Sequence, residues 1–137
     1  MKQIRRGVFE TNSSSTHSIT MCSENEYDKW KNGELYFERY NDCFCSKKDI
    51  INKAKKTQNE CIEKQKNGKK IYSYQKDYIN AKNDEELFKI ENGDDKNYMT
   101  YDEFWDYYGD EYETFEDSYT TEKNEKVIAF GYYGYDG

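Results

Sequence analysis

The sequence predicts a single α+β domain spanning residues 1–137. We expect a small, mostly antiparallel sheet, one long surface helix at about 47–66 and one amphipathic aromatic helix at about 101–108. The length of 137 residues suits one core. Strand-like segments lie near both ends, and helix caps precede the helical patterns. Aromatic residues make up 18% of the chain against a hydrophobic fraction of 34%, so the core should be built from rings.

The N-terminal segment is predicted as a hairpin with a wide polar tip. Residues 4–9 alternate loosely, as a strand does. Residues 11–16 have no apolar side chain, which is typical of a loop because short polar side chains compete for backbone hydrogen bonds. Residues 18–22 resume as a strand through Ile19 and Met21.

The next segment is predicted as a short helix followed by a strand. Ser23 and Glu26 have the spacing of a capping box, and the helix should run through Trp30. Asn-Gly at 32–33 indicates its end. Residues 34–40 alternate apolar and polar side chains and are predicted as a strand.

The middle of the chain is predicted to be largely helical. Ser46 and Asp49 form a cap pattern before the helix at 47–66, whose apolar stripe is narrow and whose other faces are rich in lysine. The apolar and aromatic residues of 69–81 fit either a strand or a helix, and this segment is predicted as a strand and then a loop. A short helix is expected at 84–90.

The clearest helix signal lies near residue 100. Thr100 and Glu103 make a capping box, and Gly109 provides the matching stop. Four rings at i, i+3, i+4 and i+7 fall on one helical face, which indicates a core-facing helix. These rings are Tyr101, Phe104, Trp105 and Tyr108.

A C-terminal hairpin should close the domain. Residues 112–121 and 126–133 are predicted as its strands, with a turn near 123–124. The second strand is apolar on both faces, which favours a central position in the sheet.

Charge is distributed unevenly along the chain. Residues 1–70 carry a net charge of +5 and residues 71–137 carry −12, which together give −7. No run approaches the roughly 18 apolar residues of a spanning helix, and the N-terminus lacks a secretion signal. We therefore expect a protein of the host cell cytosol, with reduced cysteines, no cofactor and no membrane partner.

A carboxylate-rich run in the C-terminal half is the first candidate site. No Lys or Arg interrupts it, so it can present a negative surface to a basic groove that normally holds nucleic acid. The alternative is that these acids are simply the solvated side of core elements. The candidate residues of this acidic run are Asp102, Glu103, Asp106, Asp110, Glu111, Glu113, Glu116 and Asp117.

A lysine-rich stretch at 47–70 suggests direct nucleic-acid binding, which the overall negative charge disfavours.

The polar N-terminal loop is the second candidate site. Its hydroxyls, amides and arginines can cradle a phosphate, and the histidine adds a titratable group. The loop lacks the glycine pattern of a P-loop, so a structural loop, a ligand-binding loop and a catalytic loop all stay open. The candidate residues are Arg5, Arg6, Ser13, Ser14, Ser15, Thr16 and His17.

A zinc site formed by His17, Cys22, Cys43 and Cys45 is the third candidate. These are soft ligands of the kind that close a tetrahedral zinc site. The Cys-Phe-Cys spacing departs from the two to four intervening residues usual in such sites. Ordinary thiols are therefore the preferred interpretation.

The segment RRGVFETNSSSTHS at residues 5–18 resembles the opening of short uncharacterised proteins carried by phages and mobile elements of low-GC bacteria. The resemblance implies an origin in a phage or mobile element, and it implies no particular activity because none is established for those proteins. Small acidic proteins of this origin are often inhibitors of host defence, such as anti-CRISPR proteins. The sequence thus favours a non-enzymatic acidic protein that binds a host protein or nucleoprotein complex with a basic surface. A nucleotide- or phosphate-binding protein or small enzyme using residues 5–18, and a zinc-stabilised interaction module, are the alternatives.

Overall fold

The computed structural model describes residues 15–135 and confirms an α+β fold. The helices are α1 (Glu24–Lys31), α2 (Lys47–Lys66), α3 (Ser73–Asn80), α4 (Asp84–Asn92) and α5 (Tyr101–Gly109). The strands are β1 (Ser15–Ser23), β2 (Tyr36–Glu38), β3 (Cys43–Cys45), β4 (Tyr98–Met99), β5 (Glu113–Thr120) and β6 (Lys126–Tyr135).

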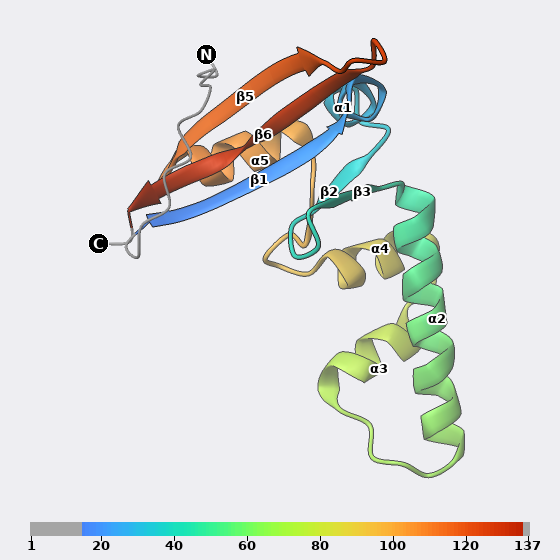
Figure 1. Ribbon diagram of the computed structural model, residues 1–137. Helices are drawn as coiled ribbons and strands as arrows, with labels where there is room; N and C mark the ends of the chain where they lie inside the picture. The colour runs from blue at the N-terminus through green and yellow to red at the C-terminus, as the bar shows by residue number, and fades with distance from the viewer. Residues whose placement is uncertain (1–14, 136–137) are drawn as a thin grey trace.

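The strands form two antiparallel sheets, ordered β1-β6-β5 and β3-β2-β4. Figure 1 shows the larger sheet at one end of the molecule, with α5 lying along it and α1 beside one end. At the opposite end α2, α3 and α4 pack together, and the smaller sheet lies between the two ends. No helix in residues 15–135 combines the length and apolar character needed to cross a membrane.

Strand β6 is central in its sheet, as its two apolar faces predicted. It pairs with β1 on one side and with β5 on the other. Gly131 permits the close approach of β1: a Cβ atom built there would lie 1.9 Å from the carbonyl oxygen of Ser18. A side chain at this position would therefore force the two strands apart.

The core is aromatic, as predicted from composition. Trp30 is fully buried at its centre, with ring centroids 5.0 Å from Phe130 and 5.3 Å from Phe104. Its indole N–H donates a hydrogen bond to the carbonyl of Met99 at 3.1 Å. Helices α1 and α5 and strands β2, β4 and β6 all contribute to this cluster. Its buried members are Tyr27, Trp30, Phe37, Met99, Phe104, Tyr108, Ile128 and Phe130.

The predicted helix caps are confirmed. Ser23 and Glu26 form a capping box at the start of α1, and Thr100 and Glu103 form another at the start of α5. Ser46 caps α2, which spans the predicted residues 47–66. These starts depend on side chains only three residues apart, so the sequence alone determines them.

The prediction of strand and loop at residues 69–81 is wrong, because α3 occupies most of this segment. The Gln75 side chain accepts a hydrogen bond from the backbone N–H of Tyr72 at 2.9 Å. At the other end of α3, the Gln58 amide of α2 donates to two backbone carbonyls at 2.8 and 3.2 Å. A long-range contact therefore stabilises this helix against the strand preference of its tyrosines.

The predicted loop at 11–16 also requires correction. Ser15 and Thr16 belong to β1, opposite Tyr135 and Gly134 of β6. Pairing with β6 satisfies backbone groups that the sequence assigned to a loop. The predicted strand at 4–9 lies outside the described residues.

Candidate functional site

The structure places five of the eight predicted carboxylates at the surface of α5, the segment after it and the start of β5. We call these five residues the acidic face. They are Asp102, Asp106, Asp110, Glu111 and Glu113, all exposed. The opposite side of α5 carries Phe104 and Tyr108, which are buried in the core. The acidic face therefore lies on a helix whose orientation is fixed by aromatic packing.

Asp102, Asp106 and Asp110 form a single row along α5. They are spaced four residues apart, which puts successive members on one side of a helix. Asp110 follows the last helical residue, but its φ of −70° and ψ of −35° continue the helical geometry. Each step along the row corresponds to a rise of about 6 Å.

Two of the three row positions are unfavourable for the helix that carries them. The C-terminal end of a helix has a partial negative charge, and basic residues are favoured there. Helices α1, α2 and α4 have lysines in their last turns, whereas α5, like α3, has none. Asp106 lies in the last turn of α5 and Asp110 directly follows it. Helix stability therefore favours Asp102, which lies in the first turn, but does not explain Asp106 and Asp110.

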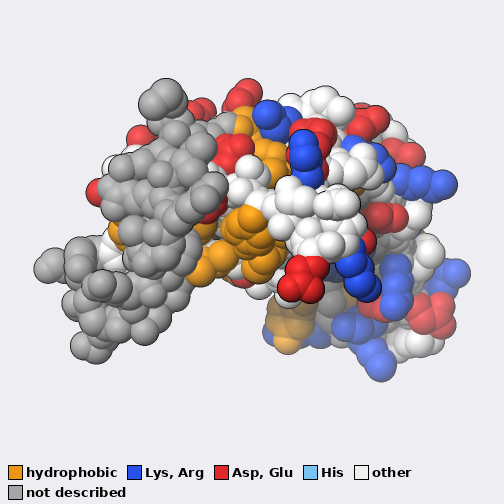
Figure 2. Space-filling model, turned by 45° about the horizontal axis from the view of Figure 1, so that its top comes forward, with side chains coloured by type: hydrophobic (Ala, Val, Ile, Leu, Met, Phe, Trp, Pro, Cys, Tyr) orange, Lys and Arg blue, Asp and Glu red, His pale blue; other side chains and the backbone are white. Residues whose placement is uncertain are grey.

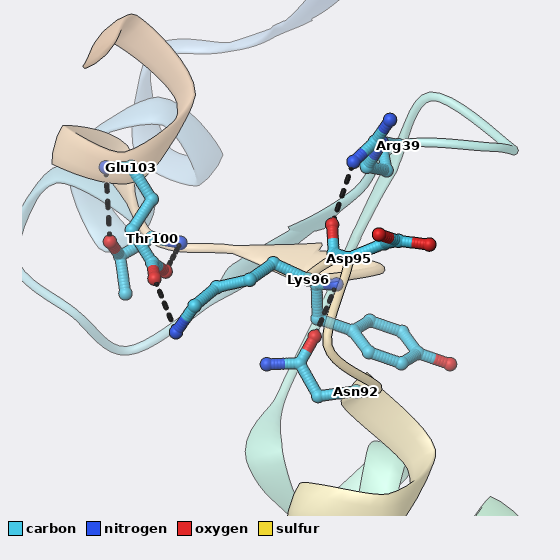
Figure 3. A network of polar contacts seen from close by, with 7 residues as sticks. Arg39, Asn92, Asp95, Lys96, Thr100 and Glu103 are labelled. Atoms are coloured by element: carbon cyan, nitrogen blue, oxygen red, sulfur yellow. Dashed lines mark hydrogen bonds and ion pairs between the residues drawn. The ribbon is translucent and has the colours of Figure 1, made fainter. Parts of the chain in front are cut away.

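Glu103 is held within the fold and does not belong to the acidic face. Its carboxylate accepts hydrogen bonds from the backbone N–H of Thr100 and from the Lys96 ammonium, both at 2.9 Å (Figure 3). Partial burial opposes its ionisation, but the hydrogen bonds from Thr100 and the charge of Lys96 outweigh burial and lower the pKa of Glu103. This residue acts in the capping box with Thr100 that the sequence predicted.

The remaining two carboxylates are also withdrawn from the surface. Asp117 is only 9% exposed, and its Oδ1 accepts a hydrogen bond from the backbone N–H of Ser118 at 2.9 Å. Glu116 is partly buried in β5. Because side chains alternate along a strand, Glu116 and Asp117 lie on opposite faces of β5.

A hollow of about 380 Å³ opens beside Asp110 and Glu111. Four tyrosines and one arginine complete its lining. The rings of Tyr108 and Tyr132 are stacked, with centroids 4.0 Å apart and planes 8° apart. The hollow thus combines carboxylates with aromatic faces. Its lining residues are Arg39, Tyr107, Tyr108, Asp110, Glu111, Tyr112 and Tyr132.

Arg39 borders this hollow and was not identified from the sequence. One guanidinium nitrogen donates to the carbonyl of Asp95 at 2.7 Å (Figure 3). The guanidinium carbon lies 4.8 Å from the ring centre of Tyr107. A second hollow, of about 400 Å³, lies on the other side of this arginine–tyrosine pair. Arg39 is 68 residues from Tyr107, so local sequence patterns cannot reveal the contact.

The predicted N-terminal ligand loop is only partly described. Arg5, Arg6, Ser13 and Ser14 lie outside the described residues. Ser15, Thr16 and His17 occupy the backbone of β1, and their side chains are likewise outside the description. The ligand-loop hypothesis therefore stays a prediction.

The cysteines of the zinc hypothesis lie on two different sheets. Cys22 is on β1 of the larger sheet, whereas Cys43 and Cys45 are on β3 of the smaller one. Within the described residues no group of three or more His, Cys, Asp or Glu side chains has an arrangement that could hold a metal ion. Burial raises the pKa of both Cys22 and Cys45 to about 12, so both are thiols at neutral pH.

Comparisons with protein-family models, curated proteins and solved structures found no match for this chain.

Proposed function

We propose that this chain is a non-enzymatic binding protein whose acidic face docks on a basic surface of a protein or nucleoprotein complex. The observation that carries the proposal is the row formed by Asp102, Asp106 and Asp110. All three carboxylates are exposed, and α5 gains no stability from Asp106 and Asp110 at its C-terminal end. Because these two carboxylates oppose the dipole of their own helix, a partner of opposite charge best explains them.

The neighbouring hollow suits the same kind of partner. Tyrosine rings attract the ammonium of lysine and the guanidinium of arginine, and carboxylates pair with both. The hollow beside Asp110 and Glu111 offers both kinds of group within about 380 Å³, and its positive lining residue, Arg39, is bonded to the carbonyl of Asp95. A basic side chain projecting from the partner would enter on the side of the two carboxylates, while the row on α5 contacts neighbouring basic residues.

The proposed partner is a complex of the host cell that handles nucleic acid, which the chain would inhibit from the cytosol. Two observations support this narrower proposal: the negative charge of the acidic face, and the resemblance of residues 5–18 to phage and mobile-element proteins. Charges in the row are about 6 Å apart, sparser than the one per roughly 3.4 Å of a DNA strand. The acidic face would therefore occupy a few basic residues of a groove.

The test is capture of host proteins by three versions of the chain. The first is the wild type, and the second carries Asp102→Asn, Asp106→Asn and Asp110→Asn. The third is a charge-matched control with Glu60→Gln, Glu63→Gln and Asp77→Asn, which changes exposed acids at the other end of the molecule. Captured proteins are then released with duplex DNA or with salt.

We expect the wild type and the control to capture a common partner that DNA and salt release. The acidic-face variant should retain that partner at least roughly tenfold more weakly, because three surface charges are removed. Equal capture by the acidic-face variant, or a partner that DNA does not displace, would contradict the proposal.

A further inference from the structure

A second charged surface lies at the opposite end of the molecule from the larger sheet. We call it the basic tip and define it as residues 64–76. These residues include five lysines and no Asp or Glu. In Figure 1 this segment forms the end of α2, the turn after it and the start of α3. Most of the Lys and Arg side chains visible in Figure 2 gather on the side where α2 lies in Figure 1. The lysines are Lys64, Lys66, Lys69, Lys70 and Lys76.

All five lysines of the basic tip are exposed. Among the described residues none of them has an ion pair, whereas Lys47, Lys55 and Lys96 each bind a carboxylate. Their positive charge is therefore available to a ligand.

Two tyrosines lie exposed among these lysines. Tyr72, the N-cap residue of α3, is 53% exposed and Tyr74 is 61% exposed. Their rings are parallel within 5°, with centroids 6.4 Å apart. The Lys70 ammonium lies 5.2 Å from the centre of the Tyr72 ring. Neither ring belongs to the core cluster, so burial does not explain the pair.

Helix stability explains only part of this surface. Lys64 and Lys66 occupy the last turn of α2, where a positive charge is favourable. Lys69, Lys70 and Lys76 lie beyond α2 and gain nothing from its dipole. The stacked rings have no such role either. Three lysines and two aromatic rings are left to be explained by something outside the chain.

We propose that the basic tip binds single-stranded nucleic acid. Unpaired bases would stack on Tyr72 and Tyr74, while the lysines contact the phosphates on either side. Aromatic platforms within a positive surface are the recurrent solution for single strands, because every base offers a flat face. A duplex hides those faces within its own stack, so it can use only the lysines.

The negative charge of the acidic face restricts nucleic-acid binding to the basic tip. Net charge is −7, and a nucleic acid is repelled from most of the C-terminal half. Because the basic tip lies at the other end of the molecule (Figure 1), a strand can approach there without meeting the acidic face. The interaction is thus separate from the proposed function, and either can fail without the other.

The experiment is a fluorescence anisotropy titration of the full chain with labelled oligothymidylate, oligouridylate and a duplex of equal length. The key variant is Tyr72→Ala with Tyr74→Ala. The corresponding double Phe variant keeps both rings, and Tyr119→Ala removes an exposed tyrosine from the sheet. Circular dichroism of each variant checks that the fold is intact.

We expect the single strands to bind more tightly than the duplex. The double Ala variant should lose roughly 5- to 100-fold in affinity, whereas the double Phe and Tyr119→Ala variants should bind like the wild type. The variant with Lys69→Gln and Lys70→Gln should have a shallower slope of log affinity against log salt, by roughly 1.4, since each charge contributes about 0.7. The control variant with Lys29→Gln and Lys123→Gln should leave that slope unchanged.

The DNA and RNA oligonucleotides decide which strand is preferred, and preference for either supports the proposal. Three results would overturn it: no saturable binding of either strand, affinity unchanged in the double Ala variant, or a duplex bound as tightly as the single strands.

Discussion

The acidic face and the basic tip differ in what holds them as well as in charge. The acidic face lies on α5, the segment after it and the start of β5, and the inner residues of α5 enter a core of stacked and edge-on rings. The basic tip comprises the end of α2, the turn after it and the start of α3, and α3 is attached to α2 by the Gln58 amide. The row of carboxylates on α5 suits a folded partner with a fixed basic surface. The lysines of the basic tip suit a flexible single strand of nucleic acid.

The largest difference between the two ends should appear in stability. Trp30→Ala removes the centre of the aromatic core and should lower the free energy of unfolding by about 3–5 kcal/mol. Tyr72→Ala in the basic tip should change it by less than about 0.5 kcal/mol. Urea unfolding measures both. A comparable loss in the two variants would show that the basic tip is part of the core.

The attachment of α3 should depend on one side chain. Gln58→Leu removes the side-chain donor that two backbone carbonyls at the end of α3 share, although the Tyr78 carbonyl keeps the N–H of Ala81, and it should cost about 1–3 kcal/mol. Amide hydrogen exchange should accelerate in α3 while protection in β6 stays high. Gln65→Leu, at an exposed position of the same helix, is the control. Uniform acceleration across the chain would argue against a separately held α3.

Much of this fold could be predicted, because its strongest signals are local. Each of the three caps depends on side chains three residues apart, and the rings of α5 repeat at helical spacing. The central position of β6 followed from its two apolar faces. In these cases the residues that determine the structure are neighbours in the sequence.

The missed features depend on distant contacts. Helix α3 needs Gln58, which is 20 residues from Tyr78. The short strands β3 and β4 exist through pairing with β2, and neither is long enough to show a period. In the candidate site, exposure of Asp102 and Asp106 followed from the helical pattern, but the burial of Asp117 and the approach of Arg39 to Tyr107 did not.

Removing the N-cap of α5 or of α2 should have similar effects on stability but different effects on binding. Thr100→Ala removes the N-cap of α5 and should cost about 1 kcal/mol. Ser46→Ala removes the N-cap of α2 at a similar cost. Thermal unfolding measures the stabilities. Only Thr100→Ala should also weaken binding through the acidic face, and an equal loss of binding in Ser46→Ala would contradict the assignment of that face to α5.

Asp106→Asn should stabilise the protein while weakening its binding. The carboxylate lies in the last turn of α5, so its removal relieves repulsion by the helix dipole worth about 0.3–1 kcal/mol. High salt should abolish the gain. Unfolding at low and high salt tests this prediction, with Glu122→Gln, at an exposed position in the turn between β5 and β6, as a charge control. Destabilisation by Asp106→Asn would remove the main argument for a functional row.

The smallest expected effect concerns pH. The pKa of Glu103 is lowered in the folded protein, so its contribution to stability is present above the unfolded pKa of about 4.3 and is lost as pH falls through the folded value. Because this side chain is partly exposed, the contribution should stay below about 1 kcal/mol. Glu103→Gln should flatten the loss of stability in acid, and Glu111→Gln should not. Identical acid profiles for Glu103→Gln and the wild type would refute the bonded role of Glu103.

We propose that the row formed by Asp102, Asp106 and Asp110 binds where a partner holds nucleic acid. The most direct measurement is displacement of a labelled duplex from the captured partner by increasing concentrations of the chain. We predict that the wild type and the charge-matched control displace the duplex equally. The variant with asparagine at all three row positions should require at least roughly tenfold more protein. Equal displacement by that variant would contradict the claim.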